Sequence, residues 1–338
     1  MNLTEDDYHA YPAWSHSVVY KYAKDGFPAI ATLHDKTEPT PSMEFGSLFD
    51  SMITRGSVTK EEYVIFEDNI PPAEKKCLDT LSHITKEKNL VEVSKAEIMR
   101  AKAESMYYPN WGFDATFKHL NDYHRYFETI QSGKKVCSRK DWDDAVEMYR
   151  NFRSDKFLKE LFGTKNHDGI EYLYQTQYLV DWTSEDGETV KIKIMPDLIK
   201  VDHNAKTIQP VDLKTSSVQA YRFKENFIQF RYDLQATMYT YALDQVKSKD
   251  PDYWDYEILP YIFTDISRSD KVPVSYVYDQ FAESQKDGLS YTYNGREVKY
   301  KGWQQLMNEI LRYERIGAVV PDGIKTEAVN NLIDIMNR

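Results

Sequence analysis

Three polar residues near the middle of the chain have the types and the spacing for metal-dependent chemistry. Asp197 lies near the end of one apolar segment, and Asp212 and Lys214 lie two positions apart at the end of the next. Carboxylate oxygens are hard ligands that suit Mg²⁺ or Mn²⁺, and magnesium usually takes only one or two of them while keeping waters and phosphate oxygens. An ammonium group beside such a cation offsets phosphate charge. The set is typical of a metal nuclease.

Two neighbouring strands are needed to bring these residues together. From Val190 to Leu198 apolar and polar residues alternate, which predicts a half-buried strand. A polar stretch follows, which predicts a turn. A second strand is expected from Ile208 to Lys214, and Asp212 shares a face with the lysine because the two are two residues apart. The resulting hairpin places Asp197 level with them at one end of a sheet.

The predicted geometry gives each residue a role. Asp197 and Asp212 are the expected metal ligands, with the backbone carbonyl of Leu213 as a third. A bound cation lowers the pKa of its water and polarises the scissile phosphate. Lys214 is expected to hold the attacking water or help to deprotonate it. The alternative is an ordinary charged strand end, since Asp-x-Lys after Pro-Asp occurs often by chance.

The same segment resembles the motif of the PD-(D/E)XK nuclease superfamily, which is matched here by Pro196, Asp197, Asp212 and Lys214. The resemblance implies a restriction-endonuclease-like core. We therefore expect an α/β fold with a central mixed β-sheet flanked by helices, extended by a helical insertion.

A helix expected after the second strand carries a polar and aromatic seam. Arg231, Gln235 and Tyr239 recur at four-residue steps beside an apolar stripe, as in an amphipathic helix. The Gln-x-x-x-Tyr element resembles the helix that follows the catalytic strand in RecB-like, RecE-like and lambda-exonuclease-like members of the superfamily. This resemblance implies that Gln235 and Tyr239 lie beside the active site, and we expect the seam to bind substrate. A boundary between core and surface is the alternative.

Two N-terminal segments also resemble these nucleases. Gly46 and Asp50 lie one turn apart on an expected helix, similar to a Gly-x-x-x-His helix whose His binds metal. Asp50 stands in place of that His, and it is expected either to bind the metal or to act as a cap or ion-pair partner. Ser15 and His16 fall in a segment that resembles the family's Ser-x-Ser element, and His16 is expected to face solvent or to be hydrogen-bonded.

The resembling nucleases often carry a further Glu near the metal, for which this chain has no direct match. Alternation from Tyr172 to Trp182 predicts the strand on which that Glu would lie. Gln175 and Gln177 are the nearest residues, and a neutral carboxamide binds a metal only weakly. Glu171 is the fallback. An inactive or unusual member of the family would first show itself at this strand.

Composition limits the class of protein. The chain has 338 residues, of which 41% are hydrophobic and 14% aromatic, as in a globular protein with one large core or two smaller ones. It has no 18-residue apolar run and no signal-like N-terminus, so a cytoplasmic protein without a membrane partner is expected. Cys77 and Cys137 are too few for a disulfide framework or a four-cysteine metal site.

Taken alone, the net charge of −11 opposes a nucleic-acid partner, because neutralisation of phosphates dominates such binding. A bound cation would neutralise the carboxylates at the site, however, and DNA needs only a local basic lining. The expected lining consists of Lys191, Lys193, Lys214, Arg222, Lys224 and Arg231.

A single nuclease domain over residues 1–338 is expected. Residues 1–56 hold N-terminal helices with Asp50, 57–168 a helical insertion beside the substrate groove, 169–245 the catalytic sheet and the Gln-x-x-x-Tyr helix, and 246–338 further strands and helices.

The resemblance implies a Mg²⁺- or Mn²⁺-dependent deoxyribonuclease, most similar to RecE-like exonucleases of phage or prophage type that act on the ends of linear duplex DNA in recombination or repair. It also implies DNA as the partner, a single-strand annealing protein as a further partner, and assembly into a homo-oligomer. Two alternatives stay open. One is an endonuclease, and the other is a nuclease-fold module that binds nucleic acid or protein with its catalysis weak or lost.

Overall fold

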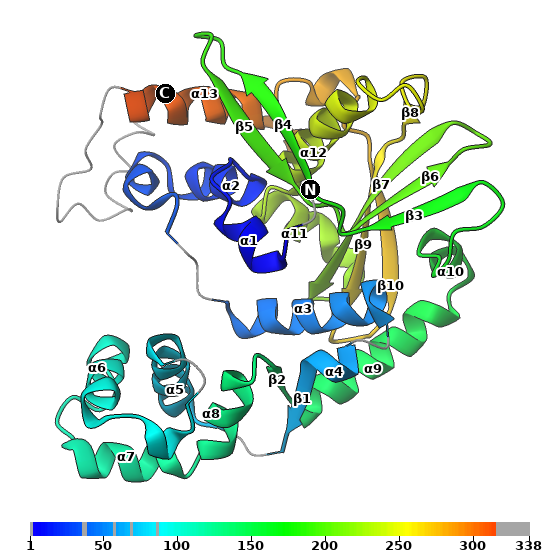
Figure 1. Ribbon diagram of the computed structural model, residues 1–338. Coiled ribbons are helices and arrows are strands. Elements are labelled where there is room, and N and C mark those ends of the chain that lie inside the picture. The colour runs from blue at the N-terminus through cyan, green and yellow to red at the C-terminus, as the bar shows by residue number, and fades with distance from the viewer. Residues whose placement is uncertain (1–2, 36–38, 57–58, 68–69, 86–87, 316–338) are drawn as a thin grey trace. The chain divides into compact units, whose positions relative to one another are not determined.

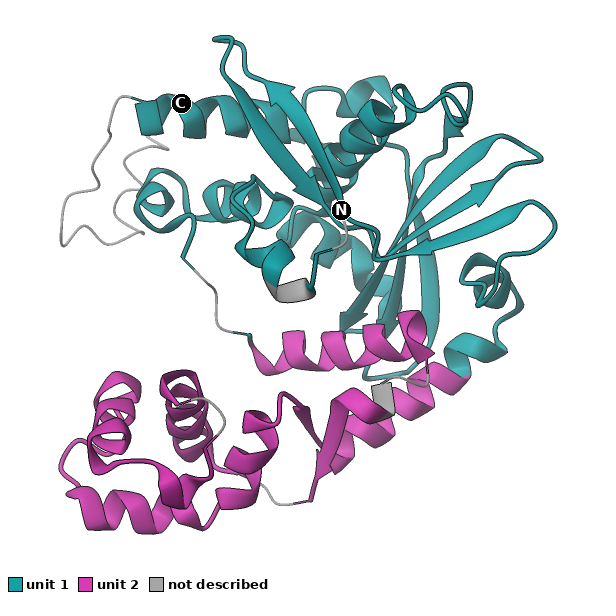
Figure 2. Cartoon of the chain, viewed as in Figure 1, with its two compact units in different colours: residues 1–39, 151–338 teal, residues 40–150 magenta. Residues whose placement is uncertain are grey.

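A computed structural model of the protein describes residues 3–35, 39–56, 59–67, 70–85 and 88–315 (Figure 1). The chain divides into two compact units (Figure 2), of which unit 1 comprises residues 1–39 and 151–338 and unit 2 comprises residues 40–150. Unit 2 is therefore inserted into the sequence of unit 1. The expected insertion, 57–168, overlaps it with later bounds, and the assignment of one nuclease domain to the whole chain stays a prediction. The expected C-terminal region after Arg315 lies outside the described residues.

Unit 1 is built on a six-stranded mixed sheet. Five strands follow one another in the order β10-β9-β7-β6-β3, and the short β8 pairs with β7. The pairs β7–β9 and β7–β8 are parallel, whereas β9–β10, β6–β7 and β3–β6 are antiparallel. The strands are β3 (Ile170–Tyr174), β6 (Leu198–Asp202), β7 (Thr207–Ser216), β8 (Glu257–Ile258), β9 (Tyr261–Ser267) and β10 (Pro273–Tyr278). With helices beside this sheet, the predicted fold class is confirmed.

Two strands expected to be continuous are each broken in the structure. The segment from Val190 to Leu198 divides between β5 (Thr189–Ile194) and β6, with Pro196 in the break. Proline has no N–H to donate to a ladder, which favours a strand end there. The segment from Tyr172 to Trp182 divides between β3 and β4 (Tyr178–Thr183), and Gln175 between them has a φ of +46°. That left-handed backbone is incompatible with a continuous strand.

These breaks separate β4 and β5 from the main sheet, and the two strands form an antiparallel hairpin of their own. Trp14 extends the hairpin by a bridge to Ile192, in which Trp14 N donates to Lys191 O and Lys193 N donates to Trp14 O. A second small hairpin consists of β11 (Ser290–Tyr293) and β12 (Arg296–Lys299).

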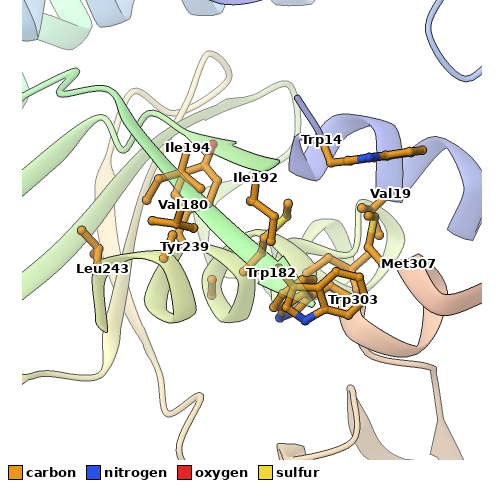
Figure 3. Packing of buried hydrophobic residues seen from close by; sticks show 14 of the residues in the cluster. Trp14, Val19, Val180, Trp182, Ile192, Ile194, Tyr239, Leu243, Trp303 and Met307 are labelled. Carbon is orange, nitrogen blue, oxygen red and sulfur yellow. The ribbon is translucent and has the colours of Figure 1, made fainter. Parts of the chain in front are cut away.

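The core of unit 1 surrounds α12 (Tyr232–Lys247). Apolar side chains of this helix pack with the β4–β5 hairpin, with α2 and α13, and with β9 of the main sheet. Figure 3 shows this packing, with Val19 of α2 beside Met307 of α13 and Trp303 of α13 beside Trp182 of β4. The helices of unit 1 are α1 (Glu5–Ala10), α2 (His16–Asp25), α10 (Lys156–Leu161), α11 (Phe223–Gln229), α12 and α13 (Trp303–Arg315).

Unit 2 is mainly helical and has its own core, formed around Leu78, Leu81, Ile98 and Phe127. Its two short strands, β1 (Tyr63–Phe66) and β2 (Lys135–Ser138), are parallel. Its helices are α3 (Pro41–Thr54), α4 (Thr59–Glu62), α5 (Pro72–Ile84), α6 (Lys95–Ser105), α7 (Phe113–Asn121) and α8 (His124–Gln131), and α9 (Arg139–Ser154) continues into unit 1. Among the helices described in either unit, none has the length and apolarity to cross a membrane.

Candidate active site

The three residues expected to do chemistry lie together where β6 begins and β7 runs beside it. Asp197 immediately precedes β6, and the register pairs Leu198 with Val211, so Asp197 reaches the level of Asp212. The Leu213 backbone N–H donates to Asp197 Oδ2 at 2.7 Å. The hairpin that achieves this is β6–β7, because the expected first strand ends before Pro196.

Asp212 is the most enclosed member of this group, with 1% of its surface exposed. Its Oδ2 lies 2.5 Å from Lys214 Nζ, and its Oδ1 accepts a hydrogen bond from Gln235 Nε2 at 2.5 Å. Lys214 Nζ donates in turn to Gln235 Oε1 at 3.1 Å. The three side chains, from β7 and α12, therefore form a closed set of contacts in which the charge of a buried carboxylate is balanced.

Lys214 carries a firmly held positive charge. Burial by itself lowers the pKa of its ammonium, but Asp212 first, then Tyr232 and Asp197, raise it, and the net effect is a pKa above the usual value. The ammonium also lies over the Tyr232 ring, 4.8 Å from its centroid. In this arrangement Lys214 is therefore an ammonium paired with Asp212.

The Gln-x-x-x-Tyr pair of α12 faces the site, as the helical spacing predicts. Gln235 contacts both Asp212 and Lys214, and Tyr239 is buried four residues later. Burial raises the pKa of Tyr239 well above its usual value, and Tyr8 of α1 and the carboxylates of Asp212 and Asp197 raise it further. Tyr239 is thus a neutral phenol between α1 and the carboxylates.

Arg231, the third residue of the expected seam, points elsewhere. It is the N-cap of α12 with a φ of +51°, and its guanidinium makes two 2.9 Å hydrogen bonds to Asp233. It also donates to Lys301 O at 2.6 Å and lies over the Tyr300 ring. Arg231 therefore binds the protein itself, and a contact between Arg231 and DNA would first require this buried ion pair to open.

The three residues considered as an additional group near the metal lie in different places. Gln175 N donates to Asp197 O at 3.1 Å, so its backbone adjoins the site. Gln177 accepts from Leu3 N and donates to Leu3 O, which ties the N-terminal segment to the start of the hairpin. Glu171 pairs with Val201, four residues beyond Asp197, or roughly 13 Å along the strand. The fallback to Glu171 as a shell group is therefore wrong.

Asp50 lies on α3, one turn after Gly46, on the helix that the sequence predicted. Its side chain is partly buried. It belongs to unit 2, and its role as a metal ligand stays a prediction.

Two residues at the site were missed or misjudged from the sequence. The His16 ring lies 6.3 Å from the Tyr239 ring, and burial, followed by the charge of Lys214, lowers the pKa of His16 to about 3. His16 is therefore partly buried beside Tyr239, and the expectation that it is hydrogen-bonded stays a prediction. Asp265 on β9 is fully buried opposite Lys214. Burial raises the pKa of its carboxyl to about 7, although a hydrogen bond from Ser216 acts to lower it. A lone acidic residue inside an apolar strand was the available signal.

Most of the expected basic lining is engaged within the protein. Lys191 pairs with Asp181, Arg222 with Glu225, and Arg231 with Asp233. Lys193 Nζ donates to the backbone carbonyls of residues 8, 9 and 11 at the end of α1. Lys214 remains at the site itself, and Lys224 is exposed on α11.

The donor set at the site fits a hard divalent cation. Asp197, just before β6, lies level with Asp212 on β7, and Asp212 Oδ2 has an ion pair but no hydrogen bond. Within the described residues no group of three or more His, Cys, Asp or Glu side chains comes together. Magnesium usually binds one or two carboxylates and completes its shell with water and phosphate oxygens, so two are enough.

Comparison with known proteins agrees with this geometry. Residues 19–315 match the PD-(D/E)XK nuclease superfamily. No curated protein matches the chain. A solved structure described as "Crystal structure of SSO0001" is similar at 13% identity and a TM-score of 0.27, over 74% of this chain and 86% of that chain. This likeness is too weak to support a conclusion about the protein. Because the family match spans most of the chain and includes Asp197, Asp212 and Lys214, this protein belongs to the PD-(D/E)XK nuclease superfamily.

Proposed function

We propose that the protein is a metal-dependent nuclease that hydrolyses phosphodiester bonds of DNA, and that Asp197, Asp212 and Lys214 form its active site. One observation carries the proposal: Asp212, Lys214 and Gln235 contact one another in a buried position beside Asp197. Membership of the superfamily supports nuclease activity with DNA as the substrate, and such nucleases generally use divalent ions such as Mg²⁺ or Mn²⁺.

The residues of the site have distinct roles in this proposal. Asp197 and Asp212 supply oxygen ligands, and the Leu213 carbonyl supplies a third. A divalent ion bound there would lower the pKa of its water and polarise the phosphate. Lys214 offsets the negative charge that develops on the phosphate. Gln235 holds the Asp212 carboxylate in place.

We further propose an exonuclease of the RecE-like, RecB-like or lambda-exonuclease-like branch, of phage or prophage type, which acts on linear duplex ends in recombination or repair. The support is the Gln-x-x-x-Tyr spacing of Gln235 and Tyr239 on the helix after β7, with Gln235 in contact with the catalytic strand. A role for Asp50 as a further ligand, assembly into a homo-oligomer and an annealing partner protein belong to this finer proposal.

Cleavage of end-labelled linear duplex DNA in Mg²⁺ tests the proposal. The unmutated protein should release nucleotides, and Asp212→Asn or Asp197→Asn should reduce the rate at least about 100-fold, because each removes a ligand charge. The matched control is Asp181→Asn, which neutralises an exposed carboxylate on β4 and should leave the rate unchanged. Circular dichroism should show that every variant is folded.

The same assay distinguishes the alternatives. Cleavage of closed circular duplex at a similar rate would indicate an endonuclease. Binding of DNA without cleavage by the unmutated protein would instead favour a module with catalysis lost. The observations that favour the module are Asp50 in place of the expected His and the neutral Gln175 and Gln177 in place of the expected Glu; the Gln177 amide is engaged by the Leu3 backbone. Normal cleavage by both Asp variants would contradict the assigned site.

A further inference from the structure

The ion pair between Lys214 and Asp212 occupies a position at which a metal ion would bind. The Lys214 ammonium lies 2.5 Å from Asp212 Oδ2, the oxygen that a divalent cation would need. Two cations sharing one buried carboxylate oxygen repel each other strongly, because the surroundings screen them poorly. Loading of the metal therefore requires Lys214 to leave Asp212. Its present partners besides Asp212 are neutral, namely Gln235 Oε1 and the Tyr232 ring.

A second carboxylate lies across the next strand. β7 and β9 are parallel neighbours, and their register pairs Lys214 with Asp265, so the two side chains lie on the same face of the sheet. Ser216, two residues further along β7, confirms this face because its Oγ donates to Asp265 Oδ2 at 3.0 Å. Lys214 thus lies between Asp212 on its own strand and Asp265 on the adjacent strand.

Asp265 has an oxygen available. Its side chain is fully buried, and its Oδ1 has no hydrogen-bond partner among the described residues. An unpaired carboxylate oxygen in such a place is costly, and it would be satisfied by an ammonium donor. The site therefore contains one ammonium and two buried carboxylates, of which only Asp212 is paired with it.

We propose that Asp265 is a positioning residue that accepts the Lys214 ammonium when a divalent cation takes its place at Asp212. The inference rests on the proposed function of this site, because it assumes that Asp212 is a metal ligand. In the metal-free protein the Lys214 ammonium pairs with Asp212 Oδ2. When the cation is bound, the ammonium pairs with Asp265 Oδ1 instead. After this exchange, each of the two carboxylates in the loaded protein has a cation, and Lys214 stays charged beside the phosphate.

Mn²⁺ binding to the intact protein without DNA, measured by calorimetry, tests the exchange. Asp265→Asn should weaken Mn²⁺ binding about tenfold, a coupling of ordinary size between neighbouring sites. The matched control is Asp270→Asn, which removes a nearby exposed carboxylate in the turn after β9. It should leave the affinity unchanged. If Asp265→Asn does not fold, Asp265→Ser removes the same charge and replaces it in the measurement.

A double-mutant cycle separates positioning from a structural role. Lys214→Met alone should bind Mn²⁺ more tightly, because no ammonium competes for Asp212. In that background Asp265→Asn should have no further effect, since its action passes through Lys214. An equal effect of Asp265→Asn in both backgrounds, or none in either, overturns the exchange. If Mn²⁺ binds and Asp212→Asn abolishes binding, that result leaves the proposed function intact, whereas absence of Mn²⁺ binding overturns both.

Discussion

At the scale of single residues, the site depends on charges held close together away from solvent. Asp212 is balanced by Lys214 and Gln235, while the backbone N–H of Leu213 fixes Asp197. Removing the Asp212 charge leaves the Lys214 ammonium without its carboxylate partner, which lowers the free energy of unfolding as well as catalysis. Asp212→Asn should therefore lose cleavage and some stability, which the cleavage assay and urea unfolding measure separately.

His16 should make the protein sensitive to acid. Its pKa is lowered to about 3 in the folded protein, from an ordinary value of about 6.5 in the unfolded chain. The folded state therefore binds fewer protons between these values, and the stability contributed by neutral His16 is present above pH 6.5 and lost as the pH falls toward 3. At pH 5 the loss is at most about 2 kcal/mol, since His16 keeps some contact with solvent.

Urea unfolding of His16→Gln at pH 7.5 and pH 5 measures this loss. The variant should lose less stability than the unmutated protein over that interval. Comparison with His167→Gln, an exposed histidine, separates the effect of burial from that of losing a histidine. Equal losses in the unmutated protein and His16→Gln would show that the ring does not stay neutral.

The sequence predicted the chemistry of the site better than its surroundings. Asp197, Asp212, Lys214 and Gln235 come together as their spacing on strands and a helix implies, because those contacts are local to β6, β7 and the next helix. His16 and Asp265 escaped notice because they reach the site from α2 and β9. Tertiary structure decides which residues pack together when they are far apart in the sequence. The local hydrophobic pattern of a helix or strand carries no information about such contacts.

At the scale of elements, α1 is fixed beside the site by one lysine. Lys193 Nζ makes hydrogen bonds of 2.8 to 2.9 Å to three backbone carbonyls at the end of this short helix. The sequence alone suggested Lys193 as part of a DNA-binding surface. Its ammonium instead donates to carbonyls at the C-terminal end of the helix, where a positive charge is favourable.

Lys193→Met should loosen this attachment. The methionine preserves most of the apolar stem but removes three hydrogen bonds from a charged donor, which should cost about 2–3 kcal/mol. Urea unfolding measures the cost, and hydrogen exchange should show faster exchange of the α1 amides. Lys191→Met, two residues away on the exposed face of β5, is the matched control. Similar losses in the two variants would contradict the anchoring role.

The start of α12 depends on a buried ion pair. Arg231→Met would leave Asp233 charged and without its partner, and breaking such a pair typically costs about 3–5 kcal/mol. The double variant Arg231→Met with Asp233→Leu should recover most of that loss in urea unfolding, because no buried charge remains. If DNA affinity is unchanged in the stable double variant, Arg231 does not bind substrate, and a large drop in affinity would restore that expectation.

Strand boundaries were the least predictable elements. The alternation from Val190 to Leu198 is real, yet its two parts belong to different sheets. Pro196 was used as part of a motif, although it also marks the end of β5. Gln175 gives no comparable signal, because its left-handed backbone is imposed by the turn from the main sheet into β4. Hydrophobic period reports which face is buried and not which neighbour a strand pairs with.

At the scale of the whole molecule, the fold class followed from the sequence, whereas the division into units did not. The resemblance of the segment that holds Asp197, Asp212 and Lys214 to the superfamily implied the mixed sheet. The N-terminal 39 residues were expected to belong with Asp50 in one segment, but they pack in the core of unit 1. In this core Val19 of α2 packs with α13, which lies at the other end of the described sequence. The local sequence pattern does not predict such a contact.

Unit 1 is assembled from two stretches of chain that are separated by 111 residues of unit 2, and backbone continuity is therefore not what keeps the stretches together. We expect Val19, which packs against Met307, to stay embedded in the core of unit 1 when the polypeptide is severed within unit 2. A protease recognition sequence inserted at Gly133 tests this. After cutting, two bands should appear on a denaturing gel while gel filtration shows one particle of unchanged mass, and separation of the fragments would mean that the shared core is too weak to replace the peptide link.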